Sequence, residues 1–570
     1  MLTVLVTVCN STFPVSTNTT GPSGSSPSEA AARIPIDVRR FPWIRRLAAD
    51  YAFEFPSVAP FFAGDPTDAD AWEAAIARTQ AHQRRRREIA AIVAAQQVRR
   101  RAPARAIEAG QRLARPETVA IVTGQQAGLF GGPLFTLLKA ITALKLADET
   151  ARDQGAKAVA VFWVEAEDHD WDEVRSCTVY DGLLRPRSVE LPAQPAGDPK
   201  PVAQITLDDS ISAALDELAG LLPPTDFTAA ILSQLRAAYA NGIGMADAFA
   251  RWLESVLGDR GLIVYDASDP AAKPLAASIF ARELSAPGQT SRLATSTGSD
   301  LAACGYHAQV HATDDSLALF RLDGARRPIR NQNGRLVVGE HSYDTETLVG
   351  EANERPAGFS PGVLLRPIVQ DTLFPTICYV AGPNELAYLG QLRPVYEHFG
   401  VPMPLMFPRA SATLLDSAAL RFLAKYQLPL EALQPQDDSA LNTLLKSQIP
   451  PAVEESFATA ATAIAAQMNR IVDAIPAIDP TLQGAATSTL GRMQHDLQTL
   501  HGKMIQAAKR RDETLRRQFM HARARAFPNG HAQERTIGFV SFLNQYGPAL
   551  VDRLFDELPV DLGHHWVVTI

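Results

Sequence analysis

The chain has 570 residues, 46% hydrophobic and 20% charged, which is typical of a globular protein with more than one domain. Its formal net charge of −8 argues against nucleic acid or an anionic membrane as the main partner. Beyond the N-terminus no apolar run reaches the roughly 18 residues of a membrane span, so no membrane partner is expected.

Residues 1–33 are expected to be a disordered tail, because a short apolar start is followed by a stretch rich in Ser, Thr, Pro and Gly. The start lacks the basic residues of a signal peptide. The four cysteines are scattered, without a CxxC pair, which makes a zinc cage unlikely and suits the cytoplasm.

The first ordered elements predict a βαβ unit. Residues 68–114 have a helical pattern, after which the period changes. A β-branched strand is predicted over 119–123, then a glycine-rich loop and an amphipathic helix from about Pro133. The continuous apolar run over 158–164 predicts a buried parallel strand, which completes the unit.

Further buried strands are predicted within 261–270, 376–383 and 403–409. The fold class is therefore α/β, with an open, mostly parallel, Rossmann-like core over residues 34–435. Two insertions are expected: a mainly helical one over about 185–255, and antiparallel strands over about 300–345. Ligands of such sheets bind beyond the carboxyl ends of the strands.

Residues 436–526 predict an antiparallel coiled-coil hairpin, since two apolar series with spacings of four and three flank a Pro-containing turn. Such seams often pair again between subunits, so a homodimer is expected. Residues 527–570 predict a turn and a helix that pack back onto the core. The seam residues are Phe457, Ala461, Ile464, Met468, Ile471, Ile475, Leu490, Met493, Leu497, Leu500, Met504 and Ala507.

The glycine-rich loop TGQQAGLFGGPLFTLLK (123–139) lies between a strand end and a helix start. Backbone N–H groups in such a place can hold a phosphate or a carboxylate. A tight turn alone would need the same glycines. The candidate substrate- or nucleotide-binding residues are Gly124, Gln125, Gln126, Gly128, Gly132, Thr136 and Lys139.

The stretch VFWVEAEDHDWDEV (161–174) places six carboxylates and one imidazole within nine positions. If the strand continues to Glu167, then Glu165 and Glu167 share a face. A single histidine suits Zn²⁺ poorly, whereas Mg²⁺ would accept Asp168 or Asp170. The run also suits a histidine base, or a clamp for amine and hydroxyl groups. The candidate catalytic residues are Glu167, Asp168, His169 and Asp170, while Asp172 and Glu173 fit a solvated helix start.

A third group of polar residues is embedded in apolar sequence over 360–392 and 403–413. A buried charge must be paired, so Arg366 is expected to meet a ligand or an acid, with Asp371 as the structural alternative. Ser411 fits either ligand contact or a helix cap. His307 and His311 would share a strand face but lack further metal ligands. The candidate binding residues are Arg366, Gln370, Asp371, Asn384, Glu385, Arg409 and Ser411.

Five stretches together resemble the bacillithiol biosynthesis cysteine-adding enzymes, a family of cysteine ligases. They are GQQAGLFGGPLFTLLKA, VFWVEAEDHDWDEV, GLIVYDASDP, LLRPIVQDTLFPTICYVAGPNELAY and VPMPLMFPRASATL. The resemblance runs from about Ile34 to the C-terminus. It implies a core related to class I nucleotidylyl-transferases and aminoacyl-tRNA synthetases, with two connecting insertions and a coiled coil used for dimerisation.

The resemblance also implies a reaction, the attachment of L-cysteine to the amine of glucosaminyl-malate to give bacillithiol. It implies ATP or another nucleotide, with Mg²⁺ as a further candidate, and places the nucleotide or acyl group at the loop from Gly124 to Pro133. This loop lacks the His-x-Gly-His signature of those relatives, so adenylate and otherwise pre-activated routes both stay open. The alternatives are a Mg²⁺-dependent nucleotide or phosphate-ester transferase using Asp168 and Asp170, and a non-enzymatic coiled-coil scaffold.

Overall fold

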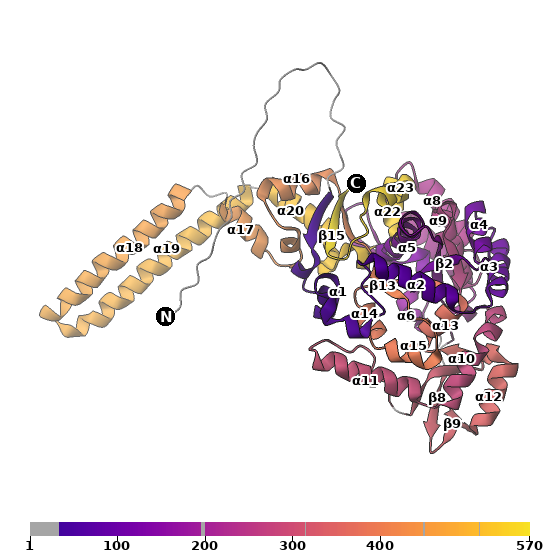
Figure 1. Ribbon diagram of the computed structural model, residues 1–570. Helices are drawn as coiled ribbons and strands as arrows, with labels where there is room; N and C mark the ends of the chain where they lie inside the picture. The colour runs from indigo at the N-terminus through magenta and orange to yellow at the C-terminus, as the bar shows by residue number, and fades with distance from the viewer. Residues whose placement is uncertain (1–32, 195–199, 314, 448–450, 512) are drawn as a thin grey trace, which may run out of the picture.

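The computed structural model describes residues 33–194, 200–313, 315–447, 451–511 and 513–570. The expected disordered tail lies outside the described residues, except for Arg33, which begins strand β1 (Arg33–Asp37). The described chain folds into one large body, from which a long helical hairpin projects (Figure 1).

Five parallel strands form the central sheet in the order β13-β12-β2-β3-β6. Numbered along the chain, these strands have the order 5-4-1-2-3, so the direction of strand addition reverses between β2 and β12. This confirms the Rossmann-like α/β class, and the reversal is where such sheets bind ligands. The strands are β2 (Thr118–Gln126), β3 (Lys157–Glu165), β6 (Ile263–Asp266), β12 (Thr376–Ala381) and β13 (Leu405–Pro408).

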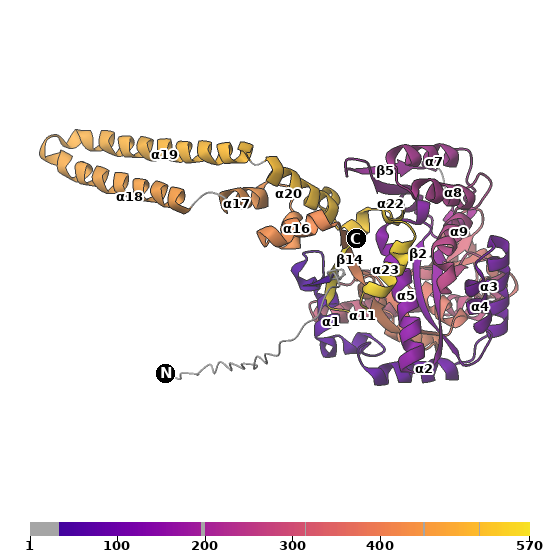
Figure 2. The same ribbon diagram turned by 90° about the horizontal axis from the view of Figure 1, so that it is seen from above.

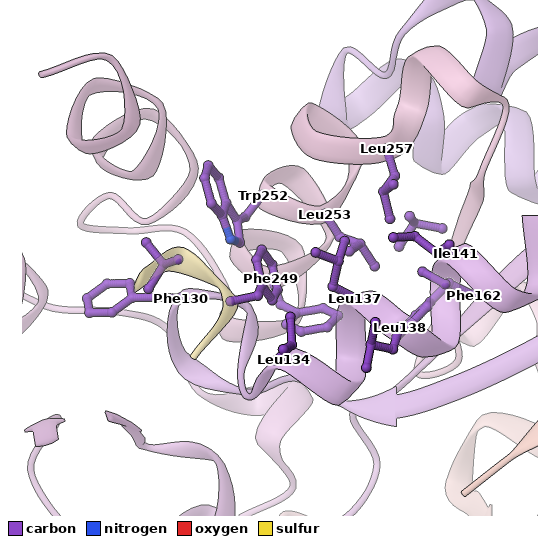
Figure 3. Close-up of a cluster of buried hydrophobic side chains, with 14 of the residues drawn as sticks. Phe130, Leu134, Leu137, Leu138, Ile141, Phe162, Phe249, Trp252, Leu253 and Leu257 are labelled. Carbon is purple, nitrogen blue, oxygen red and sulfur yellow. The ribbon is translucent and has the colours of Figure 1, made fainter. Parts of the chain in front are cut away.

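Each face of the sheet has its own hydrophobic core, because successive strand residues point to opposite faces. On one face, α5 (Leu134–Asp153) packs against α9 (Met245–Leu257), and Figure 3 shows Leu137 beside Phe249 and Leu253. On the other face the core includes residues of several helices. Among these are α3 (Arg86–Arg100), α4 (Ala104–Arg112), α10 (Lys273–Ser285) and α13 (Arg366–Leu373).

The first insertion begins with a hairpin, β4 (Ser176–Tyr180) and β5 (Pro186–Glu190), before α7 (Ser210–Leu221) and α8 (Thr228–Ala238). The second is an antiparallel sheet of order β10-β9-β8-β7-β11. Its strands are β7 (Ser316–Leu322), β8 (Arg326–Gln332), β9 (Arg335–Val338), β10 (His341–Tyr343) and β11 (Phe359–Pro361).

The predicted strand at 305–311 is wrong. Helix α11 (Gln289–Ala303) ends just before it, and residues 305–311 belong to no strand. His307 and His311 therefore do not share a strand face. In the described part of the chain, no group of three or more His, Cys, Asp or Glu side chains is arranged to hold a metal ion.

The C-terminal segment contains more than the predicted turn and helix. Helices α21 (Gln533–Thr536), α22 (Phe539–Tyr546) and α23 (Ala549–Glu557) contact α5. The final strand β15 (His564–Thr569) joins β1 and β14 (Ser411–Leu415) in a second sheet. This sheet brings both ends of the described chain together with the segment that follows β13.

The projecting hairpin, here called the arm, consists of α18 (Pro451–Ala474) and α19 (Gln483–Arg511), which lie side by side (Figure 2). At its root are α16 (Ser417–Tyr426), α17 (Ser439–Ser447) and α20 (Glu513–Ala526). Within α18, which the structure describes throughout, no residue is fully buried. Among the described helices, none has the length and apolar character needed to cross a membrane.

Candidate active site

The candidate active site is built where β2, β3 and β12 end. Strand β2 extends to Gln126, beyond the predicted end at Thr123, so Gly124 and Gln125 belong to the strand rather than to the loop. Gln126 lies opposite Glu165 in the register of β2 and β3. Polar side chains from neighbouring strands therefore meet at the carboxyl edge, as the sequence analysis expected.

Lys139 joins the two strands at the reversal point. It lies on α5 and is buried, with Nζ 2.8 Å from Gly124 O, 3.2 Å from Gln125 Oε1 and 2.5 Å from Glu385 Oε1. All three ammonium N–H donors thus have acceptors. Burial lowers the pKa of Lys139, and Glu385 opposes this change. Lys139 therefore holds Gln125 and Glu385 in place, rather than offering a free charge to a ligand.

Arg366 lies at the start of α13 and faces an acid at this edge. Its guanidinium donates to Gln370 Oε1 (3.1 Å) and to the Tyr388 hydroxyl (3.0 Å), and Nε lies 4.0 Å from Glu165 Oε2. Burial acts against its charge, but Tyr388, Tyr379 and Glu165 hold the pKa of Arg366 above its usual range. An acid was expected beside Arg366, with Asp371 as the candidate. In the structure the acid beside Arg366 is Glu165.

Asp371 is part of the core beneath the site. It is fully buried on α13 and accepts hydrogen bonds from the Tyr396 hydroxyl (2.6 Å) and from Gln370 Nε2 (2.9 Å). Burial raises the pKa of Asp371. These contacts give Asp371 a structural role, and they connect it to Arg366 only through Gln370.

Strand β3 ends at Glu165, so Glu167 lies beyond the strand and does not share a strand face with it. Glu165 accepts from Trp163 Nε1 (3.0 Å) and from the Glu167 amide (3.2 Å), and burial raises its pKa. Glu167 forms a buried ion pair with Lys273 at the start of α10. Lys273 Nζ also donates to Phe359 O (3.0 Å). Glu167 therefore anchors the second insertion to the sheet edge.

Asp168 and His169 form a carboxylate–imidazole pair at the rim. Asp168 Oδ2 accepts from Gln126 Nε2 (3.1 Å), and Oδ1 accepts from the His169 amide (2.8 Å). His169 Nδ1 lies 3.3 Å from Asp168 Oδ1. The side chains of His169 and Asp168 are 43% and 34% exposed, so a solute can reach them. Nδ1 makes no hydrogen bond among the described residues, so Asp168 acts on the imidazole through its charge. An imidazole beside a carboxylate can serve as a general base.

Asp170 is the N-cap of the short helix α6 (Trp171–Val174), where its side chain accepts from the Glu173 amide at 3.3 Å. Asp172 is largely exposed and pairs with Arg175 at 2.6 Å. Asp172 thus fits the solvated helix start that the sequence predicted. The contacts of Asp170 are those of a cap, which orients the chain after His169.

Some of the N–H groups of the glycine-rich loop are already used within the protein. Gly131 and Gly132 have φ of +94° and +75°, so the turn itself requires glycine. Five N–H groups around the turn have acceptors within the protein. The donor and acceptor pairs are Gly128 N–H with Gln126 O (2.9 Å), Gly131 N–H with Tyr239 OH (3.1 Å), Gly132 N–H with Leu129 O (3.0 Å), Leu134 N–H with Ile537 O (2.8 Å) and Thr136 N–H with Pro133 O (2.9 Å).

Among the described residues, the buried hydroxyl groups without a hydrogen-bond partner include one on α5 and one on β6. These two are Thr136 Oγ1, in the first turn of α5, and the Tyr265 hydroxyl on β6. An unpaired buried polar atom costs about 1–3 kcal/mol, so such atoms are uncommon away from water and ligands. Thr136 stays a candidate binding residue through this hydroxyl.

Arg409 and Ser411 belong to a separate internal network. The Arg409 guanidinium forms two hydrogen bonds with the Glu534 carboxylate (2.9 and 2.7 Å), and the pair is buried. Ser411 lies on β14, with Oγ 2.7 Å from His565 Nδ1, so it caps no helix. Asn384 lines an adjacent cavity of about 80 Å³ together with Arg409 and Ser411. Arg409 is thus neutralised by the protein itself.

Four residues at the site were not identified from the sequence: Lys273, Arg326, Tyr379 and Tyr388. The Tyr379 hydroxyl donates to Glu385 Oε2 at 3.2 Å. Lys273 follows the end of β6, a position that could have identified it. No sequence pattern around Arg326 pointed to the site, because this residue reaches the sheet edge from the second insertion. Its Nη1 lies 3.7 Å from Asp168 Oδ1.

Comparison with known proteins gives matches over the described body and the arm. A family model described as bacillithiol biosynthesis BshC, N-terminal Rossmann-like domain, matches residues 34–410. The model of the C-terminal coiled-coil domain of BshC matches residues 412–570.

Curated relatives match along most of their length. A protein of Salinibacter ruber named "Putative cysteine ligase BshC" is 34% identical over 96% of this chain and 100% of the relative. Proteins with the same name from Symbiobacterium thermophilum (34% identical, 80% of this chain and 85% of the relative) and Chlorobaculum tepidum (32%, 78% and 81%) are also similar.

Proposed function

Since this chain belongs to the bacillithiol biosynthesis BshC family, we propose that it is a ligase that joins L-cysteine to the amine of glucosaminyl-malate. The bond formed is an amide, and the step is the last in bacillithiol formation. The name shared by the relatives, cysteine ligase, supports the reaction class. The amine acceptor and the place of the step come from the family resemblance.

The observation that carries the proposal is the reachable Asp168–His169 pair at the carboxyl edge of the sheet, where β2 and β3 end. The sugar amine attacks the activated carboxyl carbon of cysteine, a C–N bond forms, and the bond to the leaving group breaks. The attacking nitrogen must lose a proton. His169 accepts it through Nε2, while Asp168 faces Nδ1 and stabilises the resulting imidazolium.

The surrounding side chains suit polar, zwitterionic substrates. Glu165 and Glu385 provide carboxylates for ammonium and hydroxyl groups, and Gln125 adds a side-chain amide fixed by Lys139. These groups are held by hydrogen bonds before a ligand arrives, which reduces the cost of ordering them on binding.

ATP or another nucleotide is the energy source that we propose, in line with the family resemblance. In the loop after β2, the N–H groups of Gly128, Gly131, Gly132, Leu134 and Thr136 already have internal acceptors, which leaves fewer N–H groups for the phosphates. For Mg²⁺, no cluster of three His, Cys, Asp or Glu ligands exists in the part of the chain that the structure describes. We therefore derive no step through a nucleotide or a metal ion.

We further propose that the chain works as a cytoplasmic homodimer paired through the arm, with no nucleic-acid partner. Two seam residues of the arm, Ile471 and Leu500, are 49% and 55% exposed in the single chain. Apolar side chains exposed along paired helices are typical of surfaces that associate.

The proposal is tested by adding purified protein and isotope-labelled L-cysteine to an extract of cells that lack the gene, together with glucosaminyl-malate. The extract supplies the energy source. We expect a labelled amide product, detected by mass spectrometry, with wild-type protein. His169→Ala should give at least about a hundredfold less product, because general base catalysis contributes about 10²–10⁴-fold.

The control is Asp172→Asn, an exposed acid three residues away, which should retain wild-type activity. A fully active His169→Ala protein would remove His169 from the mechanism. The absence of product with wild-type protein would contradict the proposed reaction.

A further inference from the structure

Arg326 is a guanidinium group that the second insertion delivers to the candidate active site. It is the first residue of β8, directly after the turn from β7. Its side chain is only 9% exposed, although it belongs to a small sheet at the outside of the body. A buried arginine must be paired or must meet a ligand.

Two of its three nitrogens are anchored within the insertion. Nε donates to Ser360 Oγ (3.2 Å) and Nη2 donates to Pro361 O (2.9 Å). The guanidinium carbon lies 3.8 Å from the centroid of the Phe320 ring, which adds a cation–π contact. Phe320 and Ser360 pair across β7 and β11, so the side chain crosses the sheet in one fixed direction.

The third nitrogen, Nη1, points to the carboxyl edge of the central sheet. Its nearest acid is Asp168, whose Oδ1 is 3.7 Å away, which is too far for a hydrogen bond. Asp168 already accepts from Gln126 and from the His169 amide. Among the described residues, Nη1 makes no hydrogen bond, so its N–H groups are available to a ligand beside His169.

The charge of Arg326 adds to that of Arg366. Both guanidinium groups act on Glu165, where each lowers the pKa that burial raises. Two fixed guanidinium groups therefore act on the site around Glu165. Arginine is suited to carboxylate recognition, because its planar fork can form two parallel hydrogen bonds.

We propose that Arg326 binds a carboxylate of the malate group of the acceptor, and so makes the enzyme specific for acidic glycosides of glucosamine. This inference rests on the proposed function and deepens it. With the sugar amine at His169, the acidic substituent on the same small sugar falls within reach of Nη1. The second insertion then determines specificity, because it recognises the part of the acceptor that does not react.

The test compares two ligands by isothermal titration calorimetry with the purified full chain. Glucosaminyl-malate carries both carboxylates, whereas the methyl glycoside of glucosamine has the same amine and none. Wild-type protein should bind the malate glycoside at least about tenfold more tightly. Arg326→Gln should lose about tenfold to a hundredfold for the malate glycoside, as expected for a hydrogen bond to a charged group, and nothing for the methyl glycoside.

Two further variants make the result specific. Arg330→Gln removes the same charge from the same strand, at a half-exposed residue that faces Asp315 at 3.5 Å, and should bind like wild type. Arg326→Lys keeps the charge without the fork, and should show a smaller loss for the malate glycoside alone. If Arg326→Gln does not fold, the two ligands are compared on Arg326→Lys instead.

Equal losses for both ligands would overturn the inference, because they would show that Arg326 only supports the fold. Unchanged binding of the malate glycoside would overturn it too. If wild-type protein binds neither ligand, the proposed acceptor itself is wrong. The two failures can be told apart. If only the role of Arg326 is wrong, the wild-type protein still binds glucosaminyl-malate.

Discussion

At the scale of single residues, the site depends on a buried lysine whose hydrogen bonds are all made within the protein. Lys139 connects β2 to the segment after β12 through Glu385, and all its donors are occupied. Its partner is less buried, since the Glu385 side chain is 26% exposed and Lys139 only 2%. The contact therefore fixes one group, Glu385, that still faces the site.

We predict that Lys139→Met destabilises the protein by about 3 kcal/mol, because removing one partner of a buried ion pair leaves the other unpaired. Binding of glucosaminyl-malate should weaken as well. The double variant with Glu385→Leu should recover much of the stability, since an apolar pair can replace an ionic one, but not the binding. Urea unfolding and calorimetry measure the two effects, and equal recovery of both would contradict a positioning role.

A second residue predicts how stability depends on pH. His565 is buried between Ser411 and Thr413, and burial lowers its pKa to about 4 from 6.5. Between these values the unfolded chain binds one proton more than the folded chain. The stability from this group is therefore complete above about pH 6.5 and is lost as the pH falls towards 4.

The free energy of unfolding should fall by about 2 kcal/mol between pH 7 and pH 5 because of His565. Urea unfolding at pH 7, 6 and 5 measures this change. His565→Asn, which cannot take up the proton, should show a shallower dependence. Identical slopes for the variant and the wild-type protein would refute the assignment to this residue.

At the scale of elements, the turn between β2 and α5 depends on its glycines. Gly131 has φ of +94°, and a Cβ there would overlap the Phe539 ring of α22. Gly155 has φ of +63°, but has no atoms within 4 Å of such a Cβ. The two positions share the backbone strain and differ in packing.

Gly155→Ala should therefore cost about 1–2 kcal/mol, the price of a left-handed conformation for an L-residue. Gly131→Ala should cost at least about 3 kcal/mol, because overpacking adds about 1–3 kcal/mol to that strain. Thermal and urea unfolding of the two variants measure the difference. Equal losses would show that α22 does not pack against the turn as described.

The elements also show what the sequence could predict. Continuous apolar runs identified the central strands and the start of α5, because buried parallel strands and amphipathic helices leave clear periodic signals. The sheet of β1, β14 and β15 was missed, since it pairs Arg33 with Val568 across nearly the whole chain. The contact between Lys139 and Glu385 was missed for the same reason. Only the sheet order brings such distant residues together.

At the scale of the whole molecule, the arm stands apart from the body and exposes part of its own apolar seam (Figure 2). We predict that Ile471→Asp combined with Leu500→Asp converts a dimer into a monomer in sedimentation equilibrium. A charge placed in an apolar interface is costly to bury. Gln498→Asp, at an exposed polar position near Leu500, should leave the dimer intact. A monomeric wild-type protein would contradict pairing through the arm.

The central claim is that this protein adds cysteine to glucosaminyl-malate. The most direct measurement is a mass-spectrometric profile of thiols and sugar-malates in cells with and without the gene. We predict that cells without it lose bacillithiol and accumulate glucosaminyl-malate, and that the wild-type gene restores the profile. An unchanged profile, in cells with no second copy of the gene, would contradict the claim.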